Sequence, residues 1–419
     1  GPFREVPFHA AFFVFTLAAA GGMYVLARRL APGRALAATL LFLAAPASFI
    51  SGTSFESDMP LLAFWMASMA FFVEGVERRR AALLAASALA MGAAAMVAYS
   101  AFLLALLGAA YLWLRRSRWP AAWAVLLAPF AVIAAYQLYE RSTGGALPAA
   151  ELLGHFRDHG FQRLEMKVRN AVALLGPLGL MAAPLVWLPL AGRWRWALAA
   201  AGVGALAALY DPHPLFWLPV ACGALVLVWT AARLREPENR FLAFWLLAYF
   251  CAALAIFFAG AARYLLPLAA PLALLVTRAL KDRPRWLYAA LASNLALGAG
   301  LGWVNAQHWL GSRAFVTEAM PLARGARVWT SAEWGARYYA ERGGAKALLT
   351  NQEIHAGDFL LTSELSGQVP FSAPGLRLAP RLEREVRPRL PLRIAGLDAR
   401  AGYATVGFGL RALGWSTGP

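Results

Sequence analysis

Apolar runs long enough to cross a bilayer recur from residue 8 to residue 305, and the gaps between them alternate in character. Every second gap is dense in basic residues: Arg28, Arg29 and Arg34; Arg78, Arg79 and Arg80; Arg115, Arg116 and Arg118; Arg193 and Arg195; Arg233, Arg235 and Arg240; Arg278, Lys281, Arg283 and Arg285. A helix that crosses a bilayer changes sides at each pass, and Lys and Arg stay on the cytoplasmic side. The alternation therefore predicts a polytopic membrane protein and indicates which loops face outward.

Composition agrees with membrane insertion. The chain is 60% hydrophobic and 15% charged, whereas a soluble domain is nearer half apolar and a quarter charged. A net charge of +17 could suggest nucleic acid as a partner, but much of it lies in the six gaps and is a topology signal. We therefore expect membrane lipids, and no nucleic acid, as partners. Both cysteines, Cys222 and Cys251, lie inside apolar runs, so no outer disulfide framework is expected.

The pattern predicts about twelve spans, at 8–27, 35–50, 59–74, 81–97, 100–114, 120–137, 169–190, 196–210, 214–232, 241–258, 264–279 and 286–305. The uncharged stretch 81–114 is divided near Ala98-Tyr99-Ser100, because roughly 34 residues are too long for one crossing. An even number of spans places both ends of this chain outside. The outer segments are then 1–7, 51–58, 138–168, 211–213, 259–263 and everything after 306.

Two outer segments have a recognisable pattern. Residues 148–169 have helical spacing with an apolar stripe, which predicts an amphipathic helix on the membrane surface within the loop 138–168. After residue 306 the pattern predicts a strand at 326–330, a helix at 332–342 that ends at Gly343-Gly344, strands at 347–350 and 359–362, and a last strand at 403–410. We therefore expect a polytopic α-helical membrane domain, residues 1–305, and a small extracytoplasmic α/β domain, residues 306–419.

Asp58 ends the short outer loop 51–58 and is followed at once by Met59-Pro60 and an apolar helix. Pro60 suits a first helical turn, so one interpretation makes Asp58 a helix N-cap. The other interpretation is a carboxylate held at the membrane surface for catalysis or metal binding, with Glu56 two residues before it.

Arg263 lies at the outer end of a predicted span, against the positive-inside rule. It could extend to lipid headgroups, or it could clamp a phosphate, because a guanidinium offers forked donors that match phosphate oxygens. Pro267 and Pro271 predict a break or kink where Arg263 enters the bilayer. Asp58 and Arg263 are both costly in lipid, so we predict that they face one cavity, roofed by the 138–168 helix and the outer domain.

Weaker candidates remain. Asp211 and His213 could bind a metal or substrate hydroxyls, although a tight turn also explains them, and Tyr99 is a substrate-binding candidate. His155 and His159 have the i,i+4 spacing of metal ligands, but no second motif completes a site. No cofactor is therefore assigned, and a divalent metal stays an alternative. The chain has no GxxxxGK[ST], HExxH, GxSxG or GxGxxG motif, so a nucleotide-binding loop and a serine triad are not expected.

The chain resembles a known family in four places. They are Tyr24–Leu30 with Arg28-Arg29, the alanine-rich span to Pro46, the loop that ends in Asp58 with the run after Pro60, and Arg263-Tyr264 through Pro267 to Pro271. Over most of residues 3–280 this resembles the dolichyl-phosphate-mannose protein mannosyltransferases and their bacterial relatives, including the aminoarabinose transferases of lipid A. The resemblance implies an inverting glycosyltransferase of the C fold, and the composition, rich in Ala, Arg and Leu, suggests the inner (cytoplasmic) membrane. Its donor would be a polyprenyl-phosphate sugar on the outer face, and its acceptor a glycan, lipid or protein.

The resemblance also implies roles for single residues. Asp58 looks like the acidic residue between the family's third and fourth helices, in the active-site cavity. Arg263 and Tyr264 look like the basic and aromatic pair near the carrier phosphate, and Arg4 looks like the arginine that opens a helix after the first outer loop. The family's first helix and the first outer loop with its catalytic aspartate have no counterpart here, and Glu5 cannot be assumed to replace that aspartate. We therefore expect a fragment or an inactive relative.

Two other functions compete with a glycosyltransferase. A transporter or flippase of lipid-linked sugars would also need many helices and a lone arginine, but transporters usually show related halves, and none is visible in this sequence. A non-catalytic membrane scaffold is the second alternative, because the first loop is missing. The outer domain favours an enzyme.

Overall fold

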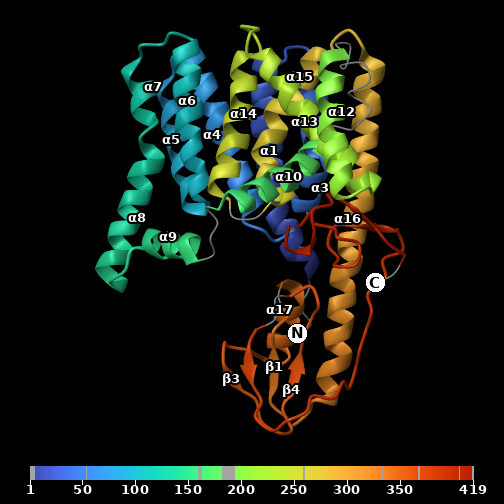
Figure 1. Ribbon diagram of the computed structural model, residues 1–419. Coiled ribbons are helices and arrows are strands. Elements are labelled where there is room, and N and C mark those ends of the chain that lie inside the picture. The colour runs from blue at the N-terminus through green and yellow to red at the C-terminus, as the bar shows by residue number, and fades with distance from the viewer. Residues whose placement is uncertain are drawn as a thin grey trace.

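The computed structural model describes residues 5–52, 54–158, 163–181, 194–257, 260–332, 334–366, 369–404 and 406–417. A bundle of helices forms one end of the molecule, and a smaller α/β unit extends from it on the last long helix (Figure 1). The helices are α1 (Glu5–Leu30), α2 (Ala35–Ala44), α3 (Pro46–Ser51), α4 (Asp58–Arg78), α5 (Ala81–Val97), η1 (Tyr99–Phe102), α6 (Leu103–Leu114), α7 (Pro120–Val125), α8 (Ala128–Gly144), α9 (Pro148–Asp158), α10 (Leu164–Met181), α12 (Trp194–Tyr210), α13 (Pro214–Arg233), α14 (Arg240–Ile256), η3 (Ala262–Leu265), α15 (Leu266–Ala279) and α16 (Pro284–Leu322).

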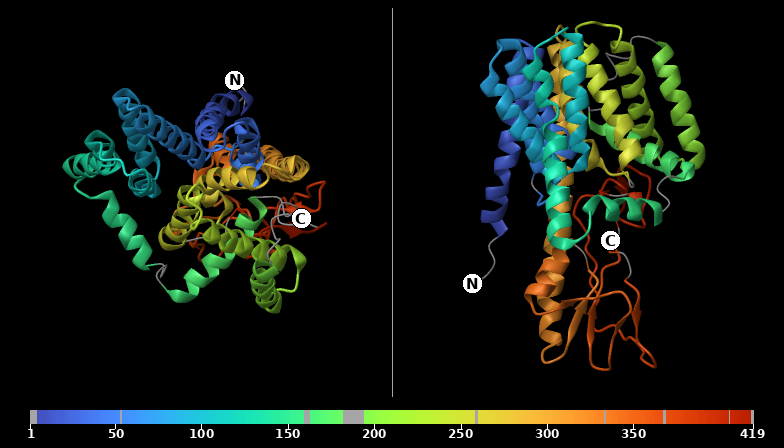
Figure 2. Two further views of the ribbon diagram at one scale, coloured as in Figure 1. Left: turned by 90° about the horizontal axis from the view of Figure 1, so that it is seen from above. Right: turned by 90° about the vertical axis from the view of Figure 1, so that its left-hand side faces the viewer.

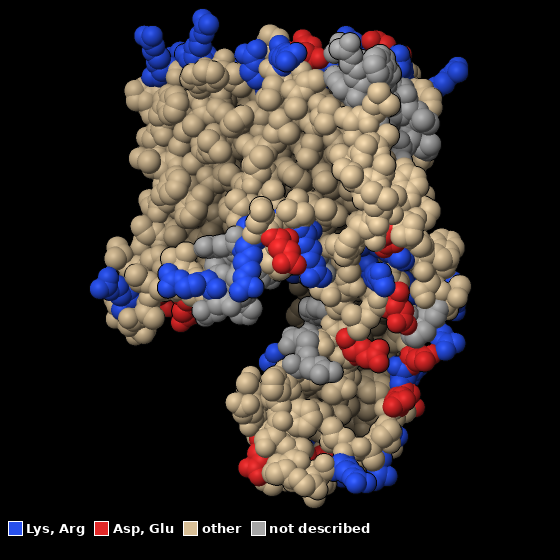
Figure 3. All heavy atoms as spheres, in the orientation of Figure 1, with Lys and Arg blue, Asp and Glu red and all other residues tan. Residues whose placement is uncertain are grey.

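Helices occupy all of the predicted spans within the described residues. Among those residues, six segments are long and apolar enough to cross a bilayer: Pro7–Leu30, Asp58–Arg78, Pro120–Gly144, Pro214–Arg233, Ala262–Ala279 and Pro284–Leu322. Shorter apolar helices fill the other positions. Figure 3 shows a broad band almost free of charged side chains between two charged ends. The chain is therefore a multi-pass membrane protein, and the number of crossings stays a prediction.

Proline divides two of the predicted spans. The run 35–50 is two helices that meet at Ala45, which has extended backbone (φ −55°, ψ 129°) before Pro46. Proline disfavours the helical conformation of the residue before it. The run 120–137 is likewise α7 and α8, with Pro129 in the first turn of α8. The break expected in 81–114 is confirmed, because α5 ends at Val97 and η1 begins at Tyr99.

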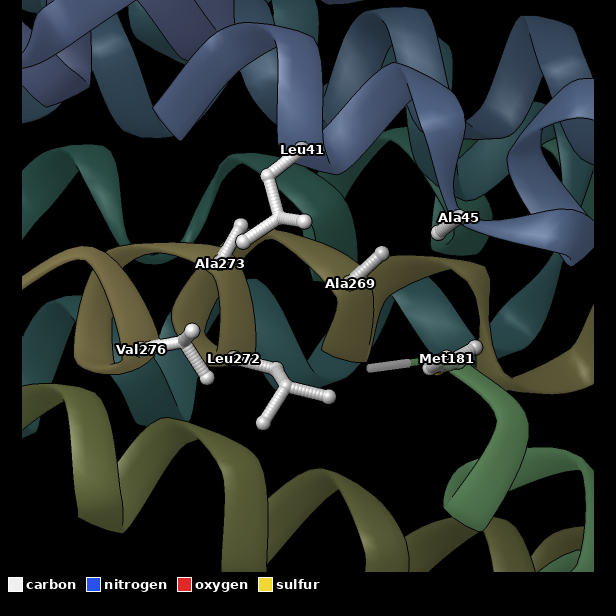
Figure 4. Close-up of a pocket in the computed structure, with 7 residues that line it drawn as sticks. All are labelled: Leu41, Ala45, Met181, Ala269, Leu272, Ala273 and Val276. Atoms are coloured by element: carbon white, nitrogen blue, oxygen red, sulfur yellow. The ribbon is translucent and has the colours of Figure 1, made fainter. Parts of the chain in front are cut away.

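The bundle interior is closely packed. Helices α10 and α13 meet at Gly179 and Gly223, where an added Cβ would lie 2.1 Å from the Pro219 oxygen and 2.0 Å from the Leu175 oxygen, respectively. Small residues of this kind let membrane helices approach closely. The cavity in Figure 4, between α2, α15 and Met181, has a volume of only about 10 Å³ and an apolar lining. It is too small for a sugar and cannot serve as the substrate site.

The two ends of the bundle have different contacts. At one end the C-terminal ends of α1, α4 and α6 meet through ion pairs, Glu74 with Arg29 and Arg78, and Glu77 with Arg115. Arg278 of α15 joins this end by hydrogen bonds to Leu30 and to the loop before α14. The segment before α4, helix α9 and the α/β unit lie at the opposite end (Figures 1 and 2). This arrangement agrees with the alternation of arginine, and we keep the outward orientation of the second end as a prediction.

The predicted surface helix over 148–169 is wrong in extent. Helix α9 covers Pro148–Asp158, and α10 begins separately at Leu164, five residues before the expected span. Residues 159–162 lie outside the described residues. Leu153 and Leu164 are exposed, so part of the expected apolar stripe lies on the surface of the protein.

The α/β unit begins without a break in the chain. Helix α16 has 39 residues, about 58 Å at 1.5 Å per residue, and runs past the expected boundary at residue 306 into the unit. Strands β1 (Val328–Thr330), β2 (Lys346–Ala347) and β4 (Phe359–Leu361) form a parallel sheet in the order β2-β1-β4, with Trp329 opposite Lys346 and Leu360. Helix α17 (Trp334–Arg342) connects β1 to β2 and ends before Gly343-Gly344, as expected. Two small sheets pair β3 (Gln352–Glu353) with β5 (Phe371–Ser372), and β6 (Leu392–Arg393) with β7 (Gly414–Trp415).

The last part of the chain packs on the bundle. Residues 391–404 and 406–416, here called the C-terminal strap, contribute Ile394, Tyr403, Ala412 and Leu413 to the core of the helical bundle. Residues of the α/β unit such as Val328 and Leu361 form a core of their own. The strand expected at 403–410 is wrong, because its described residues contain the short 3-10 helix η4 (Val406–Phe408). The predicted outer domain 306–419 therefore contains two parts with different packing partners.

Candidate active site

The chain breaks its helices where Arg263 lies. Helix α14 ends at Ile256, and the short helix η3 (Ala262–Leu265) leads directly into α15. Pro267 occupies the first turn of α15, where its missing N–H removes no helical hydrogen bond. Arg263 is thereby held on a short 3-10 helix at the end of the bundle, with the break beside Pro267 as predicted, whereas Pro271 lies inside α15 and does not end it.

Asp58 begins α4 from the other side of this site. It is the first residue of the helix, and Ser57 is the N-cap, without a side-chain capping hydrogen bond. The interpretation of Asp58 as the N-cap is therefore wrong by one position. Its carboxylate still lies in the first turn, where the positive end of the helix dipole favours a negative charge.

Arg263 and the two carboxylates come together although they are about 200 residues apart in the sequence. Arg263 Nη1 lies 3.5 Å from Glu56 Oε1, and Arg263 Nε lies 3.8 Å from Asp58 Oδ2. The predicted proximity of Asp58 and Arg263 is confirmed. The predicted roof of helix 138–168 and outer domain over a shared cavity stays a prediction.

The geometry of this cluster is open rather than closed. Strong charge-assisted hydrogen bonds measure about 2.7–2.9 Å, and both distances here are longer. Arg263 Nε is buried and makes no hydrogen bond with the described residues. A buried donor without an acceptor costs free energy. The guanidinium is therefore held near both carboxylates, with its Nε not hydrogen-bonded to either of them.

One aromatic ring contacts the guanidinium, and a second ring stacks on the first. Arg263 Cζ lies 5.3 Å from the centroid of the Tyr264 ring, a cation–π contact. Phe257 stacks against Tyr264, with ring centroids 4.2 Å apart and planes 8° from parallel. Stacking fixes Tyr264, and Tyr264 in turn limits the positions of Arg263. Phe257 is not among the residues predicted from the sequence, because one phenylalanine in an apolar run carries no signal.

Glu56 has the electrostatics of a proton acceptor. Partial burial raises the pKa of its carboxyl, Arg263 opposes that change, and the nearby charge of Asp58 adds to it. A carboxylate is a stronger base when its pKa moves toward the neutral range.

The fully buried Tyr249 of α14 packs against α4, the helix that Asp58 begins. Its ring lies edge-on to Trp65, 5.3 Å between centroids. Tyr249 thus joins α14 to the helix that carries Asp58. Nothing in the sequence distinguishes it from the other aromatic residues of α14.

The weaker candidates lie in other surroundings. Tyr99 accepts a hydrogen bond of 2.9 Å from Gln137 Nε2 of α8. Asp211 pairs with Arg411, and His213 is the N-cap of α13, where its Nδ1 accepts from the Leu215 N–H at 3.2 Å. The tight-turn interpretation explains both residues, and their binding role stays a prediction.

The predicted metal ligands and Arg4 cannot be placed in the site. His155 lies on α9, while His159 and Arg4 lie outside the described residues. Within the part of the chain that the structure describes, no group of three or more His, Cys, Asp or Glu residues is arranged to hold a metal ion.

Comparison with known proteins supports the resemblance for one part of the chain. Residues 3–139 match the family model described as dolichyl-phosphate-mannose-protein mannosyltransferase. Glu56 and Asp58 lie inside this segment, and Arg263 lies outside it. The fold was also compared with the crystal structure of ArnT from Cupriavidus metallidurans in the apo state, which matches with a TM-score of 0.37 and 17% identity over 80% of this chain and 70% of that chain. No curated protein matches the sequence significantly. Over residues 3–139, this chain is thus similar to a family of integral-membrane glycosyltransferases.

Proposed function

We propose that the full-length protein transfers a sugar from a polyprenyl-phosphate donor to an acceptor hydroxyl at the outer face of the cytoplasmic membrane. The observation that carries this proposal is the cluster of Glu56, Asp58 and Arg263 at the end of the bundle where the helices are broken. The match of residues 3–139 to a glycosyltransferase family supports it.

The cluster offers the two functions that such a transfer requires. An acceptor hydroxyl is a poor nucleophile at neutral pH, so a carboxylate of the Glu56–Asp58 pair takes its proton as the oxygen attacks the anomeric carbon. A bond forms between the acceptor oxygen and that carbon, and the bond from the carbon to the phosphate oxygen breaks. The electron pair leaves with the polyprenyl phosphate, and Arg263 stabilises its charge. Attack from the face opposite the phosphate inverts the anomeric centre.

The position of the cluster suits a lipid-linked donor. Arg263 opens Ala262–Ala279 and Asp58 opens Asp58–Arg78, two of the segments long enough to span a bilayer. A polyprenyl tail can therefore stay in the lipid beside the bundle while its phosphate reaches the guanidinium. Arg263 is about one third exposed, so an anion can approach it.

A transfer assay tests this proposal. The full-length protein in nanodiscs is incubated with a radiolabelled polyprenyl-phosphate sugar and membrane extract as the acceptor source. Asp58→Asn and Glu56→Gln remove the negative charges with little change of shape, and both should strongly reduce label transfer. Arg384→Ala is the matched control, since it breaks an exposed ion pair with Glu318 in the α/β unit.

The alternatives give different results in the same system. A flippase would move labelled donor across a vesicle membrane without forming product, and a scaffold would do neither. Full transfer activity in both carboxamide variants would remove the carboxylate pair from the mechanism.

A further inference from the structure

The C-terminal strap contacts the segment that holds Arg263 by a backbone hydrogen bond. The N–H of Ala262 donates to the carbonyl oxygen of Tyr403 at 3.0 Å. Ala262 is the first residue of η3, and the first N–H groups of a helix have no partner within it. Ala262 is 1% exposed and Tyr403 is 4% exposed, so water does not replace this contact in the folded protein. The strap thus fixes the residue directly before Arg263.

A bidentate ion pair anchors the strap to the bundle. Arg411 Nε donates to Asp211 Oδ2 at 2.7 Å, and Arg411 Nη2 donates to Asp211 Oδ1 at 3.0 Å. Asp211 also accepts from the His213 N–H at 3.0 Å, which holds it in the turn between α12 and α13. Forked pairs of this kind fix direction as well as distance. The anchor lies close to Tyr403 along the strap, because the Gly402 N–H donates to the Arg411 oxygen at 2.8 Å.

The strap has a fixed shape of its own. The Arg411 N–H donates to the Arg400 oxygen at 3.2 Å, and the Ser416 N–H donates to the Pro391 oxygen at 2.9 Å, so the segment closes on itself. At Gly409 (φ +151°) an added Cβ would lie 2.2 Å from the Arg400 oxygen, so this close approach requires glycine. A rigid segment can carry the constraint of the Asp211–Arg411 pair to the Tyr403 carbonyl.

We propose that the strap positions Arg263 for the donor phosphate, and that Asp211 and Arg411 are positioning residues for this site. The inference rests on the proposed function for the identity of the ligand. The position of Arg263 itself rests on the contacts above. Release of the strap frees the Ala262 N–H and lets η3 move, and the guanidinium then loses its place between the carboxylates and Tyr264.

This role differs from general stabilisation in its kinetic signature. Asp211→Asn and Arg411→Ala should raise the donor KM by about tenfold with little change in kcat at saturating donor, since donor binding is lost and the reacting groups stay. Arg411→Lys keeps the charge without the fork, so its KM should lie between those of wild type and Arg411→Ala. Arg384→Ala again serves as the control and should leave both constants unchanged.

A cross-link tests the geometry directly. An ideal Cβ on Gly176 of α10 would lie 2.8 Å from the Cβ of Ala412 in the strap, and a small shift brings this pair to the roughly 3.8 Å of a disulfide. Gly176→Cys and Ala412→Cys are combined with Asp211→Asn in a chain with Cys222→Ser and Cys251→Ser. Oxidation should restore the donor KM, and reduction of the same sample should remove the restoration. A donor KM that Asp211→Asn and Arg411→Ala both leave unchanged, or one that oxidation does not restore, would overturn the proposal.

A second readout needs no enzymatic activity. Ala261 is 1% exposed beside the strap contact, so Ala261→Cys should react slowly with a maleimide in the otherwise cysteine-free chain and faster when Asp211→Asn is added. If Asp211→Asn speeds the labelling of Ala261→Cys in a protein that shows no transfer activity, the result would support the positioning role of the strap and contradict only the proposed function. Equal labelling rates would overturn the strap inference whatever the activity.

Discussion

Replacing Arg263 with alanine removes the guanidinium that lies between Glu56 and Asp58 and changes two measurable quantities. The first is donor binding. A hydrogen bond to a charged group contributes about 1.5–3 kcal/mol, which corresponds to a roughly 10- to 150-fold weaker donor at about 1.4 kcal/mol per factor of ten. Arg263 is about one third exposed, and its present ion pairs measure 3.5 and 3.8 Å, so we expect the lower part of this range.

The second quantity is the pH dependence of transfer. Burial raises the pKa of Glu56 and Arg263 lowers it, so removal of Arg263 raises the pKa of Glu56 further. A base must be deprotonated to act, and the acidic limb of the kcat/KM profile therefore moves to higher pH in Arg263→Ala. Arg263→Lys keeps the positive charge without the fork. Arg263→Lys should therefore keep a pH profile close to that of the wild type, while its donor affinity should lie between those of the wild type and Arg263→Ala.

The assay is transfer from a labelled polyprenyl-phosphate sugar in nanodiscs, with donor KM and kcat measured across the range from mildly acidic to mildly alkaline pH. Arg384→Ala is treated in parallel as a variant that loses an arginine of the α/β unit. An Arg263→Ala enzyme with the wild-type donor KM and the wild-type pH profile would refute both the phosphate clamp and its influence on the carboxylates.

Three further results are expected. Single-cysteine variants at Ser54 and at the exposed Glu238 should label from opposite sides of the membrane; labelling of both from one side contradicts the topology. Asp58→Asn should lower kcat strongly and change thermal stability little, because a charge at a helix N-terminus contributes only about 0.3–1 kcal/mol; wild-type turnover would exclude Asp58 from the site. Burial alone would raise the pKa of Asp211, but hydrogen bonds from Arg411 and from the His213 N–H lower it on balance. The pair therefore stabilises the fold above the unfolded pKa of about 3.9, and this contribution is lost as pH falls through the lower folded value. Asp211→Asn should unfold at a lower temperature than wild type near neutral pH, by an amount that shrinks in acid; a difference that grows in acid contradicts this sign.

The sequence predicted those parts of the molecule that depend on local pattern. Apolar runs located the helices of the bundle, and the need to avoid isolated charges in lipid placed Asp58 near Arg263. The break at Ala45-Pro46 had a readable signal, because proline disfavours a helical residue before it, but the apolar run concealed it. Helix α16 extends beyond residue 306, the predicted domain boundary. That boundary was placed where the composition changes, but the helical periodicity of the sequence continues past it.

The contacts of the strap had no local signal. Arg411 and Asp211 are 200 residues apart. In the sequence, each of them taken alone indicates only a charged surface residue in a loop. The hydrogen bond from Ala262 to Tyr403 joins backbone groups, which every residue carries, so residue type gives no indication of it. Long-range pairing of this kind emerges only when the bundle places both segments at one end.

The unbroken helix α16 makes the orientation of the α/β unit a matter of helical phase. Each residue added to a helix rotates the chain beyond it by about 100° and advances that chain by about 1.5 Å. One alanine inserted near Asn305 would therefore swing the sheet of β1, β2 and β4 to another side of the molecule, while three or four residues, close to one full turn, would nearly restore its direction at a greater height. The strap leaves this unit and returns to the bundle, so it resists both changes. The length of α16 between residues 305 and 322 is thus expected to change only in whole helical turns.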